Sequence, residues 1–69
     1  MELTEVQKLL VACLKNCGVS LGKSMVVCLV LEETQQQLDM AEYLLNNGKV
    51  TDEEAIAQAY KIAKKQRAV

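Results

Sequence analysis

The amino-acid sequence predicts an all-α protein, a compact bundle of four short helices in a single domain spanning residues 1–69. The chain contains no proline and only three glycines, so little interrupts helical backbone. Apolar residues recur mainly at helical spacing. No turn dipeptide flanked by alternating apolar residues indicates a β-hairpin. If the second and third helices are continuous, the bundle has three helices instead of four.

The first helix is predicted to begin after Thr4. Thr4 and Gln7 match the capping-box pattern, in which two side chains bond free backbone N–H groups of the first turn. The apolar residues that follow share one stripe along the helix: Val6, Leu9, Leu10, Cys13, Leu14 and Cys17. Gly18 can adopt the left-handed conformation that ends a helix, so the helix is predicted to stop there.

The second helix is predicted over about residues 21–32, with Ser20 as its N-cap. Every residue from Met25 to Leu31 is apolar, so the amphipathic period is lost. A buried strand is the alternative, because valine favours strands, but the chain offers no partner strand. We therefore favour a helix, and a helix that is apolar on all sides is expected to be surrounded by other elements.

The third helix is predicted over about residues 35–47, with Thr34 and Gln37 as its capping box. The same residues could instead lie inside one helix from 21 to 47. We favour a break near residue 33, because a bundle requires the chain to double back. The helix carries a broad apolar stripe: Leu38, Met40, Ala41, Tyr43, Leu44 and Leu45.

The fourth helix is predicted to start at Thr51, where Glu54 completes a capping box and Val50 can pack on Ala55. Four apolar residues form its stripe: Ile56, Ala59, Tyr60 and Ala63. Acids occupy its first turn and bases its last turns, which complements the helix dipole. The basic residues are also our candidates for nucleic-acid contact: Lys61, Lys64, Lys65 and Arg67.

The sequence predicts no catalytic residue, no metal site and no cofactor. Histidine is absent, and the three cysteines are Cys13, Cys17 and Cys28. A structural zinc site uses four ligands, and a cysteine nucleophile needs a neighbouring base. Because no signal peptide is evident and the cysteine count is odd, we expect reduced core thiols in a cytoplasmic, non-enzymatic protein.

Two short motifs bear on ligand binding. Residues 18–24 resemble the end of a phosphate-binding loop, but only three residues separate Gly18 from Gly22, and a helix precedes them. We favour an ordinary turn between helices, with a weak anion site at the second helix as the alternative. Residues 14–20 also resemble the turn of a DNA-binding helix-turn-helix, but an apolar run follows where polar side chains would read bases.

The apolar run therefore points to protein binding. Its seven residues are too few for a membrane span, which needs about 20. A chain of 69 residues with 51% hydrophobic residues has little room to bury them all. We predict an interaction module that forms a homodimer through its second helix, with contacts from Met25, Val26, Leu29 and Val30.

Two other functions stay open. A net charge of −1 argues against a basic nucleic-acid surface over the whole chain, but the basic last helix could contact a phosphate backbone. The chain is also similar to short helical open reading frames of Gram-positive bacteria and their phages. That similarity rests on no specific motif, and it implies binding to another protein. A third possible function is a phage or host inhibitor that docks on a larger protein.

Overall fold

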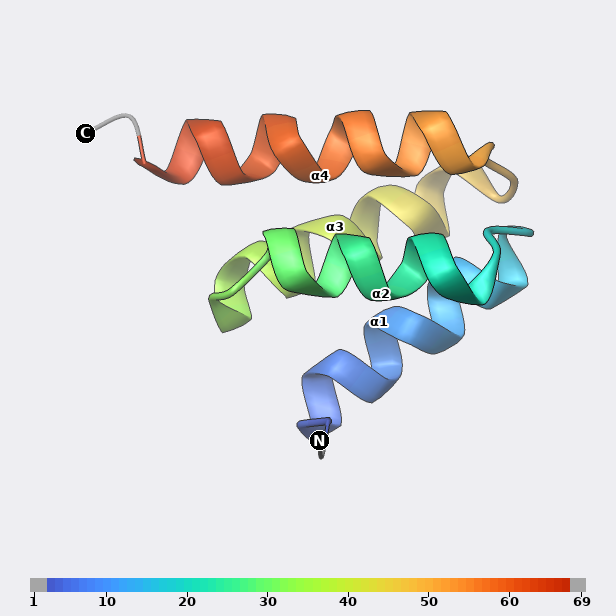
Figure 1. Ribbon diagram of the computed structural model, residues 1–69, viewed down its shortest axis with the longest axis horizontal. Helices are drawn as coiled ribbons and strands as arrows, with labels where there is room; N and C mark the ends of the chain where they lie inside the picture. The colour runs from blue at the N-terminus through green and yellow to red at the C-terminus, as the bar shows by residue number, and fades with distance from the viewer. Residues whose placement is uncertain (1–2, 68–69) are drawn as a thin grey trace.

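The structure is a computed structural model. It describes the backbone of residues 3–67 and the side chains of residues 3–65. Within this range the chain forms four helices and no strand, as predicted: α1 (Glu5–Asn16), α2 (Leu21–Val30), α3 (Thr34–Asn47) and α4 (Asp52–Arg67). The helices form a bundle in which α1 and α4 each pack against both α2 and α3 (Figure 1). The consecutive helices α2 and α3 therefore lie diagonally opposite each other.

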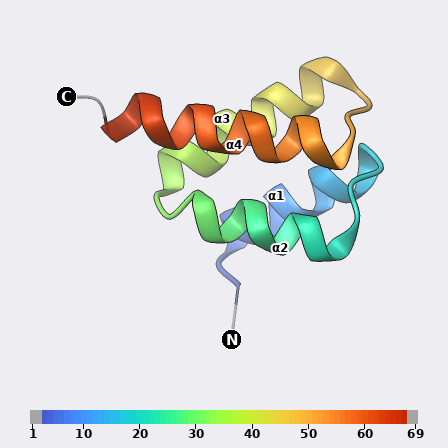
Figure 2. The same cartoon turned by 45° about the horizontal axis from the view of Figure 1, so that its top comes forward.

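Helices α2 and α4 lie side by side and run in the same direction (Figure 2). Both begin at the end of the bundle where α1 and α3 finish. The two connections at this end are joined by a hydrogen bond in which the Val50 N–H donates to the Cys17 carbonyl at 3.3 Å. Gly18 and Gly48 make these turns possible, because their φ angles of 91° and 79° lie in the left-handed region.

Two of the predicted capping boxes are confirmed. The Gln7 N–H donates to Thr4 Oγ1 at 3.1 Å, and the Thr4 N–H donates to Gln7 Oε1 at 2.8 Å. At α4, the Glu54 N–H donates to Thr51 Oγ1 at 3.1 Å, and the Thr51 N–H donates to Glu54 Oε1 at 2.9 Å. Each pair satisfies two backbone groups that a helix start leaves free.

The chain breaks between α2 and α3 close to residue 33, as favoured, but α2 ends at Val30 and the predicted third capping box is wrong. The N-cap of α3 is Glu33, whose N–H donates to Gln36 Oε1 at 3.2 Å. Gln37 is buried instead, and its Nε2 donates to the Leu31 carbonyl at 2.8 Å. That bond satisfies a buried carbonyl that α2 leaves free at its C-terminal end.

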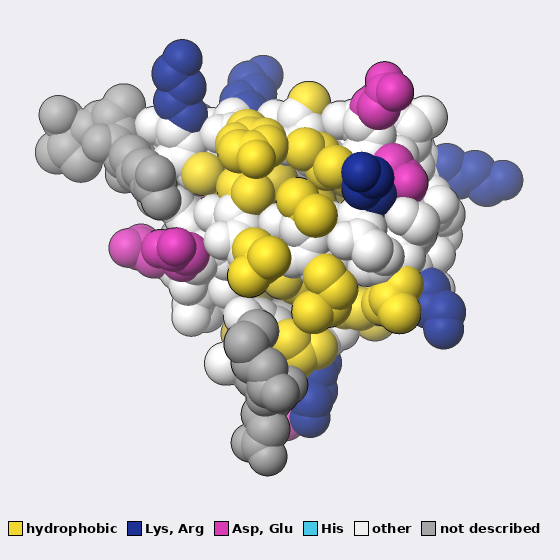
Figure 3. Space-filling view, viewed as in Figure 1, with side chains coloured by type: hydrophobic (Ala, Val, Ile, Leu, Met, Phe, Trp, Pro, Cys, Tyr) yellow, Lys and Arg dark blue, Asp and Glu magenta, His cyan; other side chains and the backbone are white. Residues whose placement is uncertain are grey.

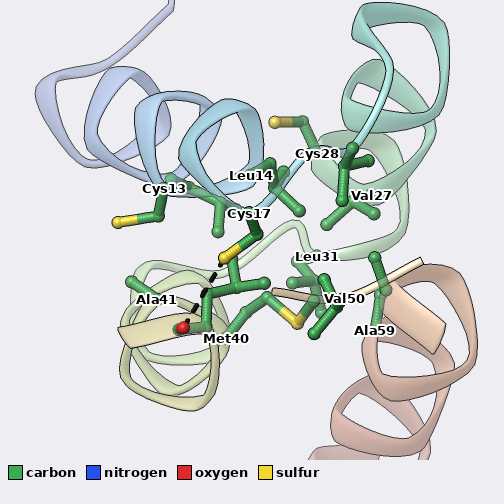
Figure 4. Packing of buried hydrophobic residues seen from close by; sticks show 14 of the residues in the cluster. Cys13, Leu14, Cys17, Val27, Cys28, Leu31, Met40, Ala41, Val50 and Ala59 are labelled. Carbon is green, nitrogen blue, oxygen red and sulfur yellow. Dashed lines mark hydrogen bonds between the residues drawn. The ribbon is translucent and has the colours of Figure 1, made fainter. Parts of the chain in front are cut away.

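The core lies between the four helices (Figure 4). Leu31, from the connection after α2, is fully buried near its centre, and α4 contributes mostly small side chains: Ala55, Ala59, Ile62 and Ala63. Several residues of the predicted stripes are exposed instead: Leu9, Leu38, Leu45 and Tyr60. Each helix packs closely on two neighbours, so its buried sector is narrower than its apolar stripe.

The expectation that α2 is surrounded by other elements is wrong. Within the apolar run, Val27, Cys28 and Leu31 are buried, whereas 65% of Leu29 is exposed. The reason is that α2 has close packing partners on two sides only, α1 and α4. The opposite side of α2 forms part of the protein surface.

Candidate protein-interaction surface

An apolar strip covers the side of α2 that points away from the core. We call it the α2 outer face and define it by five residues: Leu21, Gly22, Met25, Val26 and Leu29. With 3.6 residues per turn, these positions lie opposite the buried residues Ser24, Val27 and Cys28. Figure 3 shows hydrophobic side chains gathered over α2, with more of them over the neighbouring helices.

Large side chains of this strip are unusually open to solvent. Leu21 is 71% exposed, Leu29 is 65% exposed and Met25 is 36% exposed. Val26 between them is half-buried. A helix face with several contiguous exposed apolar side chains is typical of a binding surface, whereas single exposed apolar residues are ordinary.

The structure brings together most of the residues that the sequence suggested as an interface. Met25, Val26 and Leu29 lie on the α2 outer face, whereas Val30 lies at its edge and packs partly against the core. Leu21 was missed, because it precedes the continuous apolar run. Its signal in the sequence is its spacing, four residues before Met25 and eight before Leu29.

Charge is distributed unevenly along this strip. Lys23 is the only charged residue within α2. Beyond the other end of the helix follow Glu32 and Glu33, both exposed. The strip is therefore apolar along its length, basic near its start and acidic just past its end.

The N-terminus of α2 is occupied by a carboxylate of the chain itself. The Ser20 N–H donates to Asp52 Oδ1 and the Ser20 hydroxyl donates to Asp52 Oδ2, each at 3.0 Å. The hydroxyl of Ser24 is turned inward and donates to the Ser20 carbonyl at 2.9 Å. The weak anion site considered from the sequence is thus filled by Asp52, which links the start of α2 to the start of α4.

The cysteine side chains are buried in the core. The Cys17 thiol donates to the Leu44 carbonyl at 3.6 Å (Figure 4). Burial, and to a smaller extent the neighbouring Cys13, raises the pKa of Cys17, and burial raises the pKa of Cys28. A protonated thiol is a poor nucleophile and a poor metal ligand. Across residues 3–67, no three histidine, cysteine or acidic side chains come together as metal ligands would.

A groove of about 490 Å³ between α3 and α4 contains part of the basic segment proposed for nucleic-acid contact. Lys61 and Lys65 line it from α4, and Asp39 and Glu42 line it from α3. Lys64 is exposed, and the side chain of Arg67 lies outside the described part of the chain. Because the groove carries charges of both signs, it lacks the uniform positive surface that a phosphate backbone attracts.

The helix-turn-helix interpretation would make α2 the recognition helix. Its exposed face, however, offers Leu21, Met25 and Leu29 rather than polar groups that could bond base edges. The exposed side chains of α2 therefore complement an apolar protein surface better than the polar base edges of a DNA groove.

Among the described helices, none has both the length and the apolar composition that crossing a bilayer requires. No protein-family model, curated protein or solved structure matches this chain.

Proposed function

We propose that this protein is a non-enzymatic protein-interaction module that forms a homodimer through the α2 outer face. The observation that carries the proposal is the line of Leu21, Met25 and Leu29 along one exposed side of a helix. Burying a leucine side chain that is otherwise exposed contributes about 1.5–3 kcal/mol.

The size of the molecule is compatible with this proposal. A standard interface buries about 800 Å² on each partner, which is about a sixth of the 4735 Å² accessible surface of the chain. A helix of ten residues such as α2 is about 15 Å long. Residues flanking α2 on the neighbouring helices would therefore complete the interface.

Light scattering on the wild-type chain at tens of micromolar tests the proposal, together with Leu29→Glu. We expect a wild-type dimer and a Leu29→Glu monomer, because a carboxylate cannot be buried in an apolar contact without a partner. Leu45→Glu is the matched control: Leu45 on α3 is 74% exposed, and its substitution should leave the dimer intact. A strictly monomeric wild type, or a dimer that only Leu45→Glu disrupts, would refute the proposed interface.

A phage or host inhibitor that docks on a larger protein would use the same apolar face. A pull-down with the wild-type and Leu29→Glu chains distinguishes this from self-association, since a heterologous partner would be retained by the wild type alone. Nucleic-acid binding has less support, given the mixed charge of the α3–α4 groove. Binding to duplex DNA that falls steeply with salt, and that is lost when Lys64, Lys65 and Arg67 become Glu, would favour it over the proposal.

A further inference from the structure

Gly22 lies within α2, and no feature of the single folded chain explains why this position is a glycine. It is exposed and helical, and its φ angle is not positive. Beyond its chain neighbours and the backbone of α2 itself, a Cβ atom built on it would meet no atom within 4 Å. Gly22 is the second residue of α2, and glycine in a helix is less favourable than alanine because it loses more backbone freedom on folding. Neither a turn nor a close approach within the chain therefore accounts for this glycine.

We propose that Gly22 forms a socket for the Leu29 side chain of a second copy, in an antiparallel, two-fold packing of α2 against α2. This inference rests on the proposed function and specifies its geometry. The two-fold axis passes between Met25 and Val26. Gly22 of each copy then faces Leu29 of the other, and Met25 faces Val26.

The shape of the α2 outer face is self-complementary in this arrangement. Its smallest residue, Gly22, and the exposed Leu29 lie toward opposite ends of the strip, at equal distances from the axis. Each leucine enters the space that a missing Cβ leaves open on the other helix, flanked there by Leu21 and Met25. A two-fold interface requires this kind of match, because the same patch meets itself.

A parallel arrangement fits less well. It would set Gly22 against Gly22, which leaves a gap, and Leu29 against Leu29, which crowds the other end. It would also place Lys23 beside Lys23. In the antiparallel arrangement, Lys23 of each copy points toward the end where Glu32 and Glu33 of the other copy follow the helix. The charges near the ends then attract each other.

Gly22→Ala tests the socket, because its two expected effects have opposite signs. The isolated monomer should become more stable to urea, since alanine favours the helix. The dimer should dissociate at least about tenfold more easily, since the added methyl group fills the space for Leu29. Asn46→Ala on α3 is the control: it also raises helix propensity at an exposed position, and should leave dimer dissociation unchanged.

Cysteine cross-linking tests the direction of the pairing. A mixture of the Gly22→Cys and Leu29→Cys chains should form a disulfide between the two variants under mild oxidation. Gly22→Cys alone should cross-link poorly. The native cysteines are buried and should not compete in the folded protein, which mass mapping of the disulfide can verify.

The outcomes separate this inference from the proposed function. A wild-type chain that stays monomeric at tens of micromolar overturns both. A dimer that Gly22→Ala does not weaken, or that cross-links efficiently through Gly22→Cys alone, overturns the antiparallel socket and leaves a homodimer through α2 in place.

Discussion

Helices α2 and α4 have similar positions in the bundle, but their exposed side chains differ in chemical character. They lie side by side, run in the same direction, and begin after hydroxyl-bearing N-cap residues, Ser20 and Thr51. The exposed side chains of α4 are mostly charged, whereas those of α2 are mostly apolar. A helix beside α2 thus folds into this bundle with a charged exterior. The fold therefore does not require the apolar exterior of α2, which supports the proposed role of this face in binding.

The buried and exposed residues of the apolar run 25–31 should respond to truncation very differently. Leu31→Ala removes a fully buried side chain from the centre of the core and should lower the free energy of unfolding by about 2–5 kcal/mol. Leu29→Ala, two residues away and 65% exposed, should change it by less than about 0.5 kcal/mol in the monomer. Urea titrations at a concentration below dimer formation measure both. Equal losses would contradict the assignment of Leu31 to the core and of Leu29 to the surface.

The hydrogen bonds that link the starts of α2 and α4 should contribute less to the free energy of unfolding than the core side chain of Leu31 does. Asp52→Asn weakens two hydrogen bonds to Ser20 and should cost about 1 kcal/mol, because both groups are partly solvated. Glu53→Gln is the matched control, since it removes a charge from the same first turn but leaves the contact with Ser20. If thermal unfolding shows the same loss for both variants, the helix dipole and not the contact explains it.

The smallest effect should be a pH dependence from the buried thiols. Burial raises the pKa of Cys17 and of Cys28 above the ordinary value of 9.0. The thiols therefore stay protonated in the folded chain when they ionise in the unfolded chain. Stability should be unaffected by these groups below pH 9.0 and should fall as the pH rises above it.

A chain with both Cys17→Ala and Cys28→Ala provides the control for this pH dependence. Its urea midpoint should fall less between pH 8 and pH 10 than that of the wild type, because the two thiols that cause the fall are absent. A double variant whose midpoint falls as much as that of the wild type, or more, would contradict the assigned direction.

Local features were predicted well from the sequence. The boxes at Thr4 and Thr51 depend on groups three residues apart, and Gly18 has the positive φ that ends α1. The box at Thr34 failed for a non-local reason. Glu33 with Gln36 and Thr34 with Gln37 have the same spacing, and the choice between them follows from Gln37, whose side chain bonds the carbonyl of Leu31.

The sequence by itself determined the all-α class and the presence of more apolar surface than a short chain readily buries, and it favoured four helices with a break near residue 33 over three. These follow from local backbone preferences and composition. Only the tertiary structure decided which residues of the apolar run face the core and which face solvent, because that depends on how many neighbours α2 has. It also showed that Asp52 reaches Ser20, 32 residues away, and that Gly22 lies on an open surface, which no periodicity in the sequence reveals.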